Sequence, residues 1–266
     1  MIRRPPRSTQ GVSSAASDVY KRQTHPGNIG AAARAMANMG LEHLYLVQPR
    51  TFPSAEATAR AAGAEGLLCT AKVCETLDEA VAECGLVVGS TARERRVRWP
   101  ALDPDLAMAM AFKQGQAGNV ALVFGQEASG LTNDELDRCQ VHVRIPVDPV
   151  FPSVNLAAAV MVLSYELKKA HIRAEEEGLG QDGPRSLEST EGPLATAEKV
   201  QGFFVHLETV LREIGFLNSP SEKLLRKVKR IFSRTPLLDD DINILRGVLS
   251  AIQGRKARDS GATRIR

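Results

Sequence analysis

The stretch ALVFGQEASGLTNDEL, residues 121–136, joins an apolar run to a polar turn and then to a capped helix. The run that ends at Phe124 has the β-branched and aromatic side chains of a buried strand. The turn after it carries glycines, which admit a close backbone approach, and Thr132 followed by acidic residues is typical of a helix start. Because ligands bind beyond the carboxyl ends of parallel strands, the segment predicts a β–α unit whose loop is either a ligand site or an ordinary connection.

Similar apolar runs recur on both sides of this segment. They predict buried strands at 43–49, 67–73, 85–91, 119–125 and 141–146. Helical patterns lie at 54–64, 76–84, 131–139 and, as one long final helix, 153–177. Strands that are apolar throughout and alternate with helices predict an α/β fold with a parallel sheet covered on both faces.

The rest of the chain divides by composition. From about residue 198 there are three helical patterns with apolar spacing near 3.6 and no strand candidate, which predicts a small helical domain at 198–256. Residues 173–197 are acidic and rich in Gly, Ser and Pro, as in a flexible linker. We expect the α/β domain to occupy 24–172 and the last residues, 257–266, to be disordered.

The first 23 residues look different from everything after them. They contain a Pro-Pro pair, a Ser/Ala-rich middle and no apolar periodicity, and they resemble the translated adapter read-through found at the ends of assembled sequence fragments. We expect them to be non-native or disordered. A central strand needs apolar side chains that this segment lacks, so the α/β domain is expected to have no first strand.

Composition and charge exclude several classes of protein. Hydrophobic residues make up 43% of the chain and charged ones 24%, and no apolar run approaches the roughly 20 residues that span a bilayer, so we expect no membrane partner. The four cysteines form no CxxC pair, which suits a reducing cytoplasm better than disulfides or zinc. Outside residues 1–23 there are 29 basic and 30 acidic residues, so only local charge can indicate a nucleic-acid partner.

Two further stretches could carry chemistry. THPGNIGAAARAMANMG, residues 24–40, has G-x-x-G spacing rather than the G-x-G-x-x-G of dinucleotide sites, which argues against an NAD-dependent oxidoreductase. It predicts either a helix that packs closely through its alanines or a loop that holds Arg34 beside a phosphate. RIPVDPVFPSVNLAAAV, residues 144–160, has three prolines that stiffen its path into a helix. Ser153 there is either a helix cap or part of a loop around a flat ligand.

In order and spacing, the three stretches resemble the signature motifs of the SpoU, or TrmH, family of RNA 2′-O-ribose methyltransferases. They match N-x-G-A-x-x-R at 28–34, F-G-x-E-x-x-G-L at 124–131 and I-P…S-x-N-L-A at 145–157. Within the family, GSTARER at 89–95 and the helical stretch at 203–252 resemble the bacterial TrmJ type, which methylates position 32 in the tRNA anticodon loop. The similarity covers about residues 24–253.

This resemblance implies a SPOUT-type parallel sheet with a C-terminal trefoil knot, an exception to the rule that chains avoid knots. It implies a homodimer with composite active sites, a tRNA substrate and S-adenosylmethionine (SAM) as cofactor, without a metal. The implied cofactor-binding residues are Ser90, Thr91, Ala92, Gly125, Ile145, Pro152, Ser153 and Val154. The implied catalytic or substrate-orienting residues are Asn28, Arg34, Glu127, Ser153 and Asn155.

Transfer to a ribose hydroxyl is an in-line displacement, so the protein must align the reacting atoms and help the hydroxyl lose its proton. A guanidinium stays protonated in proteins, so we expect Arg34 to clamp the phosphate beside the target ribose. Basic clusters are either RNA contacts or solvated surface. The candidates for RNA contact are Arg93, Arg95, Arg96, Arg226, Lys227 and Arg230. Two alternatives stay open: a family member that acts on another tRNA position or on rRNA, and a non-catalytic RNA-binding member.

Overall fold

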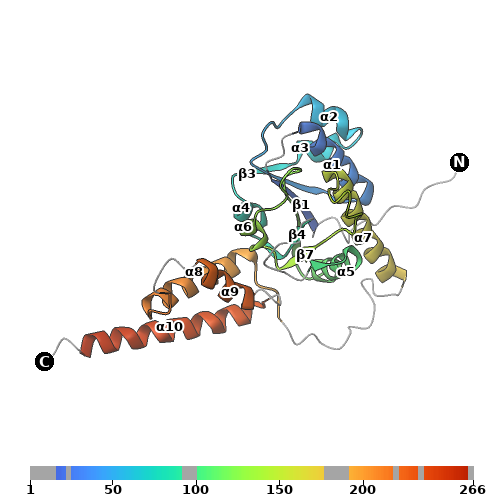
Figure 1. The fold of residues 1–266 in the computed structure, drawn as a ribbon. Helices are drawn as coiled ribbons and strands as arrows, with labels where there is room; N and C mark the ends of the chain where they lie inside the picture. Colours follow the sequence, from blue (N-terminus) through green and yellow to red (C-terminus); the bar gives the residue numbers. More distant parts are fainter. Residues whose placement is uncertain are drawn as a thin grey trace.

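The structure is a computed structural model of the chain, and it describes residues 16–21, 25–91, 101–176, 192–217, 222–232 and 237–262. An α/β domain comes first, and a domain made of the last three helices lies against one side of it (Figure 1). In the described residues, no helix is both long enough and apolar enough to cross a membrane.

Seven parallel strands form one sheet in the α/β domain, in the order β3-β2-β1-β6-β4-β7-β5. The strands are β1 (Ala16–Lys21), β2 (His43–Val47), β3 (Lys72–Cys74), β4 (Cys84–Ser90), β5 (Ala101–Leu102), β6 (Asn119–Phe124) and β7 (Val141–Val143). The predicted parallel α/β sheet is therefore confirmed. The knot stays a prediction, because the path from β4 to β5 runs through residues 92–100, outside the described part.

Helices cover both faces of this sheet. The helices are α1 (Pro26–Met39), α2 (Ala55–Ala61), α3 (Glu65–Cys69), α4 (Leu77–Val81), α5 (Pro104–Gly115), α6 (Asn133–Leu136), α7 (Leu156–Glu176), α8 (Ala197–Glu213), α9 (Glu222–Phe232) and α10 (Asp239–Ala262). Side chains of α1, α2, α5 and α7 share one core cluster, and those of α4 and α6 share another on the opposite face.

Strand β6 shows why its sequence is apolar throughout. Val120, Leu122 and Phe124 enter the cluster beside α1, α5 and α7, whereas Ala121 and Val123 enter the cluster beside α4 and α6. Successive side chains of a strand point to opposite faces, so a strand covered on both faces needs apolar residues at every position. The strand ends at Phe124, and the loop that carries Glu127 starts there.

The expected absence of a first strand is wrong. Ala16–Lys21 forms β1 between β2 and β6, with Val19 opposite Tyr45 on one side and Val123 on the other. Main-chain hydrogen bonds to two neighbours hold this parallel strand although its sequence has little apolar alternation, and Val19 joins the core cluster beside α4 and α6. Val19 is fully buried. The α/β domain therefore begins at least eight residues before the predicted boundary at 24.

Other predicted boundaries also need correction. Residues 67–73, predicted as a strand, contain the end of α3 and the start of β3, because a mixed apolar run of this length fits either structure. Helix α5 and strand β5 were not predicted. Helix α7 continues to Glu176, past the predicted domain end at 172, and helix α10 continues to Ala262, through most of the tail expected to be disordered.

The C-terminal domain contains the three predicted helices. Phe203, Phe204 and Leu207 of α8 pack with Ile242 and Leu249 of α10 in a separate core cluster. Most of the predicted linker, residues 177–191, lies outside the described residues. A small second core is consistent with a helical unit that forms by itself and docks on the α/β domain.

Candidate active site

The second and third motifs meet at one cavity of about 240 Å³ at the carboxyl ends of the strands. Its walls come from the end of β4, the loop after β6, and the segment between β7 and α7. Among the predicted cofactor residues, those that line it are Ser90, Thr91, Gly125, Ile145, Pro152, Ser153 and Val154. Ala92 lies outside the described residues. Residues more than 60 positions apart are thus brought to one place.

The loop after β6 is a tight turn that leaves no room for a side chain at its base. A Cβ added to Gly125 would lie 2.1 Å from the carbonyl carbon of Gly130. The turn is closed by the Gly130 amide, which donates to the Gln126 carbonyl at 2.7 Å, and Gly130 has a positive φ of 65°. This compact turn exposes main-chain groups of residues 125–130 to the cavity.

The ends of β4 and β7 form the adjoining wall. Ser90 pairs with Val143 in the sheet, and the Thr91 amide donates to the Val143 carbonyl at 3.0 Å. This bond extends the pairing one residue past β4, so that Ser90 and Thr91 stay at the mouth of the cavity. The path after Thr91, residues 92–100, lies outside the described part of the chain.

The proline-containing segment before α7 makes the third wall. Asp148 holds a turn in which its carboxylate accepts from the Val150 amide at 2.7 Å and its carbonyl accepts from Phe151 at 3.0 Å. Asn155 caps α7, since its Oδ1 accepts from the Ala157 amide at 2.9 Å. The alternative that Ser153 is the cap is therefore wrong. The Ser153 hydroxyl faces the cavity and has no hydrogen-bond partner among the described residues.

The first motif reaches the cavity through a side-chain contact of Asn28. The Asn28 Nδ2 group, in the first turn of α1, donates to Oε1 of Glu127, which lines the cavity. Two residues later, Gly30 packs so closely on α2 that an added Cβ would lie 2.0 Å from the Ala57 carbonyl oxygen. This close packing fixes where α1 starts, and with it the position of Asn28.

Arg34 lies one and a half turns further along α1 and is exposed. The alanines at 32, 33 and 35 around it are buried against the α/β core, so the prediction of close helix packing is confirmed. Among the described residues the guanidinium of Arg34 has no ion-pair or hydrogen-bond partner. Neither Arg34 nor Asn155 lines the cavity. Both lie on the helices that begin beside it, so a role for them needs a substrate that extends beyond the cavity.

The structure places the candidate RNA contacts in different environments. Arg93, Arg95 and Arg96 lie outside the described residues. On α9, Lys227 is exposed and Arg230 is half-buried, whereas Arg226 forms ion pairs with two aspartates of the α/β domain. Of the apolar side chains of α9, Val228 and Phe232 pack against the core of the helical domain, but Ile231 is 60% exposed.

The described cysteines are all free thiols: Cys69 is exposed and Cys74, Cys84 and Cys139 are buried. Burial raises the pKa of Cys84 and of Cys139 to about 12, so both thiols are neutral and unreactive at ordinary pH. Burial also lowers the pKa of His142, the middle residue of β7. In the described part of the chain, no three His, Cys, Asp or Glu side chains are grouped to hold a metal ion.

The cavity has the lining expected of a site for a nucleoside-like cofactor. Apolar side chains such as Ile145, Val154 and Leu156 form its floor, and a few polar groups from Ser90, Thr91 and Ser153 surround it. Its volume lies just below the range of about 300–1,000 Å³ that is usual for ligand pockets. The tight turn of residues 125–130 lines the cavity as well, and it can close so tightly because Gly125 has no side chain.

Comparisons with known proteins agree with this architecture. The family model described as the SpoU rRNA Methylase family matches residues 19–165, which include β1 to most of α7. The chain belongs to the SpoU rRNA Methylase family, and it is a methyltransferase. A second family model, for the C-terminal domain of the tRNA methyltransferase TrmJ, matches residues 198–262, which are the helical domain.

Individual relatives narrow the resemblance to the TrmJ type. The tRNA (cytidine/uridine/adenosine-2′-O-)-methyltransferase TrmJ of Pseudomonas aeruginosa is 46% identical over 237 residues, which cover 88% of this chain and 92% of that protein. The tRNA (cytidine/uridine-2′-O-)-methyltransferase TrmJ of Klebsiella pneumoniae is 42% identical, with coverage of 88% and 95%. The crystal structure of TrmJ from Z. mobilis has a TM-score of 0.76 at 33% identity, and the match covers 90% of this chain and all of that one. The predicted family is confirmed.

Sequence reasoning missed part of the site. Gln126, Ala128, Ser129 and Gly130 line the cavity, and their place between the glycines of the second motif was a usable signal. The aspartates that hold Arg226 were also missed. Their acidity was assigned to the helix start alone, and no local pattern pairs them with a residue about ninety positions away.

Proposed function

We propose that this protein transfers a methyl group from SAM to a ribose 2′-hydroxyl of tRNA. The observation that carries the proposal is the meeting of the second and third motif segments at one cavity, with Asn28 of the first motif bonded to Glu127 of the second. The names of the TrmJ relatives, which are tRNA 2′-O-methyltransferases, support the same substrate and the same atom. A tRNA substrate also suggests a cytoplasmic protein.

In this proposal the cavity holds the cofactor. Main-chain groups of the Gly125 turn and of Ser90 and Thr91 bind its polar atoms, and Ile145 and Val154 cover its flat apolar part. When bound, SAM supplies a methyl group on a sulfonium centre, which is already activated for displacement. The protein's task is therefore to position the cofactor, exclude water and bring the hydroxyl into line.

The residues beside the cavity position the ribose. The exposed guanidinium of Arg34, which has no partner within the described ranges, has forked donors that suit a phosphate of the substrate backbone. The Ser153 hydroxyl, which has no described partner, and the Asn155 amide group, whose Nδ2 is not used in the cap, are available to the nucleotide. Glu127 can accept a hydrogen bond from the ribose while it keeps Asn28 in place.

We propose position 32 of the anticodon loop as the target, because the TrmJ-type helical domain accompanies the site in the same chain. Single-stranded loops are where RNA-binding proteins reach unstacked nucleotides. The alternative is another tRNA position or an rRNA site, which the name of the family model suggests. Loss of turnover with retained RNA binding is the remaining alternative, and a complete set of motif residues argues against it.

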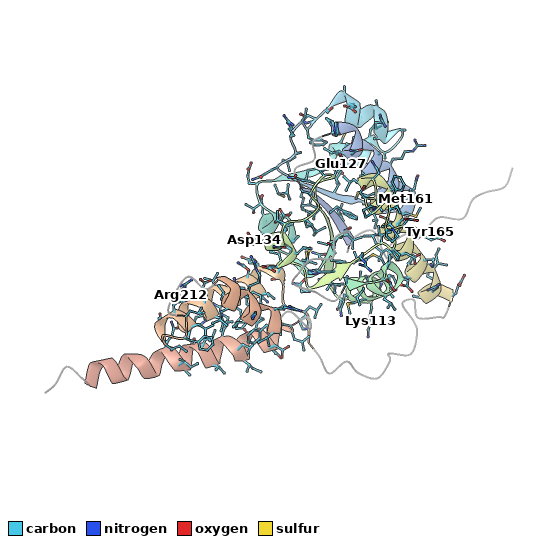
Figure 2. The ribbon with its side chains drawn as sticks, in the orientation of Figure 1. Lys113, Glu127, Asp134, Met161, Tyr165 and Arg212 are labelled. Carbon is cyan, nitrogen blue, oxygen red and sulfur yellow. The ribbon has the colours of Figure 1, made fainter. Side chains whose placement is uncertain are left out.

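We also propose the trefoil knot and a homodimer. Apolar side chains are exposed in the segment before α7 and on α7 itself: Val150 and Phe151 are 78% exposed, and Tyr165, labelled in Figure 2, is 51% exposed. Clustered exposed apolar side chains are typical of a protein interface. Sedimentation of the wild type and of Tyr165→Glu tests the dimer. We expect a dimer mass for the wild type and a monomer mass for the variant, and a monomer mass for the wild type would contradict the proposal.

Mapping of 2′-O-methylation on tRNA, before and after incubation with the protein and SAM, tests the function. We expect one new modified ribose, at position 32. A modified ribose elsewhere in tRNA or in rRNA would favour the alternative substrate. SAM binding without any methylated RNA would contradict the proposal.

A further inference from the structure

Arg226 of α9 is held between two carboxylates of the α/β domain. Its Nη2 lies 2.7 Å from Oδ1 of Asp134, and its Nε lies 2.6 Å from Oδ2 of Asp137. Both aspartates belong to α6 or its C-cap, the short helix that follows the loop of the second motif. A planar guanidinium contacts both groups with donors in a fixed geometry, whereas a lysine ammonium has no such fork.

A second arginine extends this contact to α4. The Arg138 Nε and Nη2 atoms lie 2.5 and 3.0 Å from the two carboxylate oxygens of Asp78, and its Nη1 donates to the Asp134 carbonyl at 2.5 Å. Helices α4, α6 and α9 are thereby joined by one set of charges. We refer to Asp78, Asp134, Asp137, Arg138 and Arg226 as the interdomain charge cluster.

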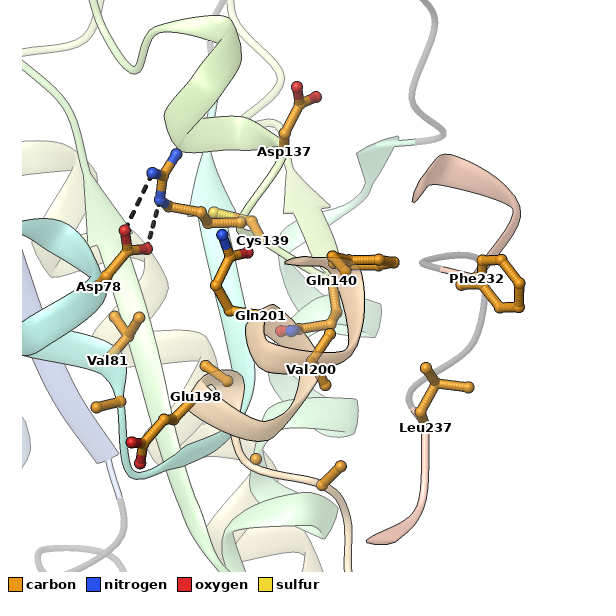
Figure 3. Close-up of a pocket in the computed structure, with 16 residues that line it drawn as sticks. Asp78, Val81, Asp137, Cys139, Gln140, Glu198, Val200, Gln201, Phe232 and Leu237 are labelled. Carbon is orange, nitrogen blue, oxygen red and sulfur yellow. Dashed lines mark hydrogen bonds and ion pairs between the residues drawn. The ribbon is translucent and has the colours of Figure 1, made fainter. Parts of the chain in front are cut away.

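The cluster borders a gap in the packing between the two domains. A cavity of about 290 Å³ lies between the α/β domain and the helical domain, with Asp78, Asp137 and Cys139 on one side and Glu198, Gln201 and Phe232 on the other (Figure 3). Close-packed apolar surfaces fix an orientation, but a gap of this size leaves part of the interface without such contacts. Directional contacts at the rim must then contribute to the orientation.

Exposure decides which of the two ion pairs matters more. The side chain of Asp134 is 76% exposed, and an exposed pair contributes little to stability. The side chain of Asp137 is only 22% exposed, and burial raises its pKa while Arg226 lowers it. Removing Arg226 would leave this carboxylate partly buried without its main counter-charge, which is the costlier change.

The cluster also adjoins the proposed active site. Asp134 and Arg138 line a further cavity, of about 320 Å³, together with Gln126, Ser129 and Gly130 of the loop beside the cofactor cavity. Helix α9 is therefore docked on the helix that directly follows this loop. Lys227, next to Arg226 in the chain, is exposed and has no ion-pair partner among the described residues.

We infer that Arg226 is a positioning residue: through Asp137 and Asp134 it holds the helical domain, with its remaining basic side chains, in one orientation to the cofactor cavity. Its consequence for tRNA rests on the proposed function, but the docking itself does not. This assignment removes Arg226 from the RNA contacts, while the neighbouring Lys227, which is exposed, stays available to meet a phosphate.

The test compares three variants of the full-length chain. Arg226→Ala removes the guanidinium, Asp137→Asn breaks the same pair while it keeps every cation of α9, and Lys227→Ala is the matched control. Domain orientation is measured as the distance between spin labels on the exposed Cys69 and on Ser250→Cys in α10, since the other three cysteines are buried. The KM for tRNA, kcat at saturating tRNA and the Kd for SAM are measured on the same variants.

We expect Arg226→Ala and Asp137→Asn to broaden the distance distribution and to raise the KM for tRNA about fivefold, with kcat and the Kd for SAM unchanged. Lys227→Ala should raise the KM for tRNA but leave the distance distribution as in the wild type. A wild-type distance and KM in Asp137→Asn, beside a raised KM in Arg226→Ala, would overturn the inference and make Arg226 a simple RNA contact. If the wild type methylates no tRNA, the proposed function fails, and the distances still decide the docking.

Discussion

The cofactor loop and the domain interface are held by different kinds of contact. At the loop, main chain lies against main chain, and an added Cβ at Gly125 would lie within 2.1 Å of backbone atoms. At the interface, charged side chains form direct ion pairs beside a cavity, with Arg226 between Asp134 and Asp137. The backbone contact allows almost no adjustment, whereas the ion pairs can break and re-form.

This difference matches what each region is proposed to do. Methyl transfer needs reacting atoms aligned within a fraction of an ångström, which a turn closed by its own main chain provides. A large RNA needs an adaptable partner surface. A helical domain docked largely through side-chain ion pairs, with one main-chain bond from the Glu198 amide to the Ala82 carbonyl beside them, provides it. The predictions below separate the two regions by the quantity that each change should affect.

The largest effect is expected from filling the base of the cofactor loop. Gly125→Ala places a Cβ against Gly130, and we expect it to lower the free energy of unfolding by about 3 kcal/mol and to abolish SAM binding. Gly66→Ala, on α3, is the matched control because its added Cβ meets nothing within 4 Å. Urea unfolding measures both, and equal stability in the two variants would contradict the close backbone contact.

The contact between the first and second motifs should give the next largest effect. Asn28→Asp replaces the donor to Glu127 with a second carboxylate, so like charges would push the two motifs apart. We expect kcat/KM for tRNA to fall on the order of 100-fold, because a small displacement of reacting groups is costly. Asn38→Asp, exposed on the same helix, should stay near the wild type. A fully active Asn28→Asp enzyme would show that the bond has no part in catalysis.

The cofactor loop and the contacts between distant segments differ in how well the sequence predicted them. Strand β6, its loop and the Thr132 cap of α6 were predicted to within a residue or two, because their patterns are local. Strand β1 was not, since its pairing with β2 and β6 depends on main-chain bonds to distant segments. Arg226 was assigned to RNA for the same reason: its partners lie about ninety residues away, and helical spacing shows only that it shares a basic face.

The clamp proposed for Arg34 predicts a moderate effect. Arg34→Lys keeps the charge but loses the forked donors, so we expect kcat/KM for tRNA to fall about tenfold at every pH tested. Arg173→Lys, exposed near the end of α7, serves as the control. Single-turnover methylation is the measurement. A lysine variant with full activity would remove the two-pronged phosphate contact from the mechanism.

The smallest expected effect concerns helix caps in the two regions. Thr132 and Glu135 form a reciprocal capping box at α6, with contacts of 3.3 and 2.7 Å, whereas Thr196 caps α8 through one contact of 3.4 Å. We expect Thr132→Ala to cost about 1 kcal/mol of unfolding free energy and Thr196→Ala about half of that. Denaturant titration measures the unfolding free energy of both variants. A larger loss in Thr196→Ala than in Thr132→Ala would argue that α6 is the more adaptable helix.

Calorimetric titration of SAM into the wild type, Ser153→Tyr and Arg226→Ala tests the central claim most directly. The claim is that the cofactor site lies in the α/β domain alone, in the cavity beside Gly125 and Ser153. We predict one SAM per chain in the wild type and in Arg226→Ala, with the same Kd, and no binding in Ser153→Tyr, whose ring would fill the cavity. Unchanged binding in Ser153→Tyr, or lost binding in Arg226→Ala, would contradict the claim.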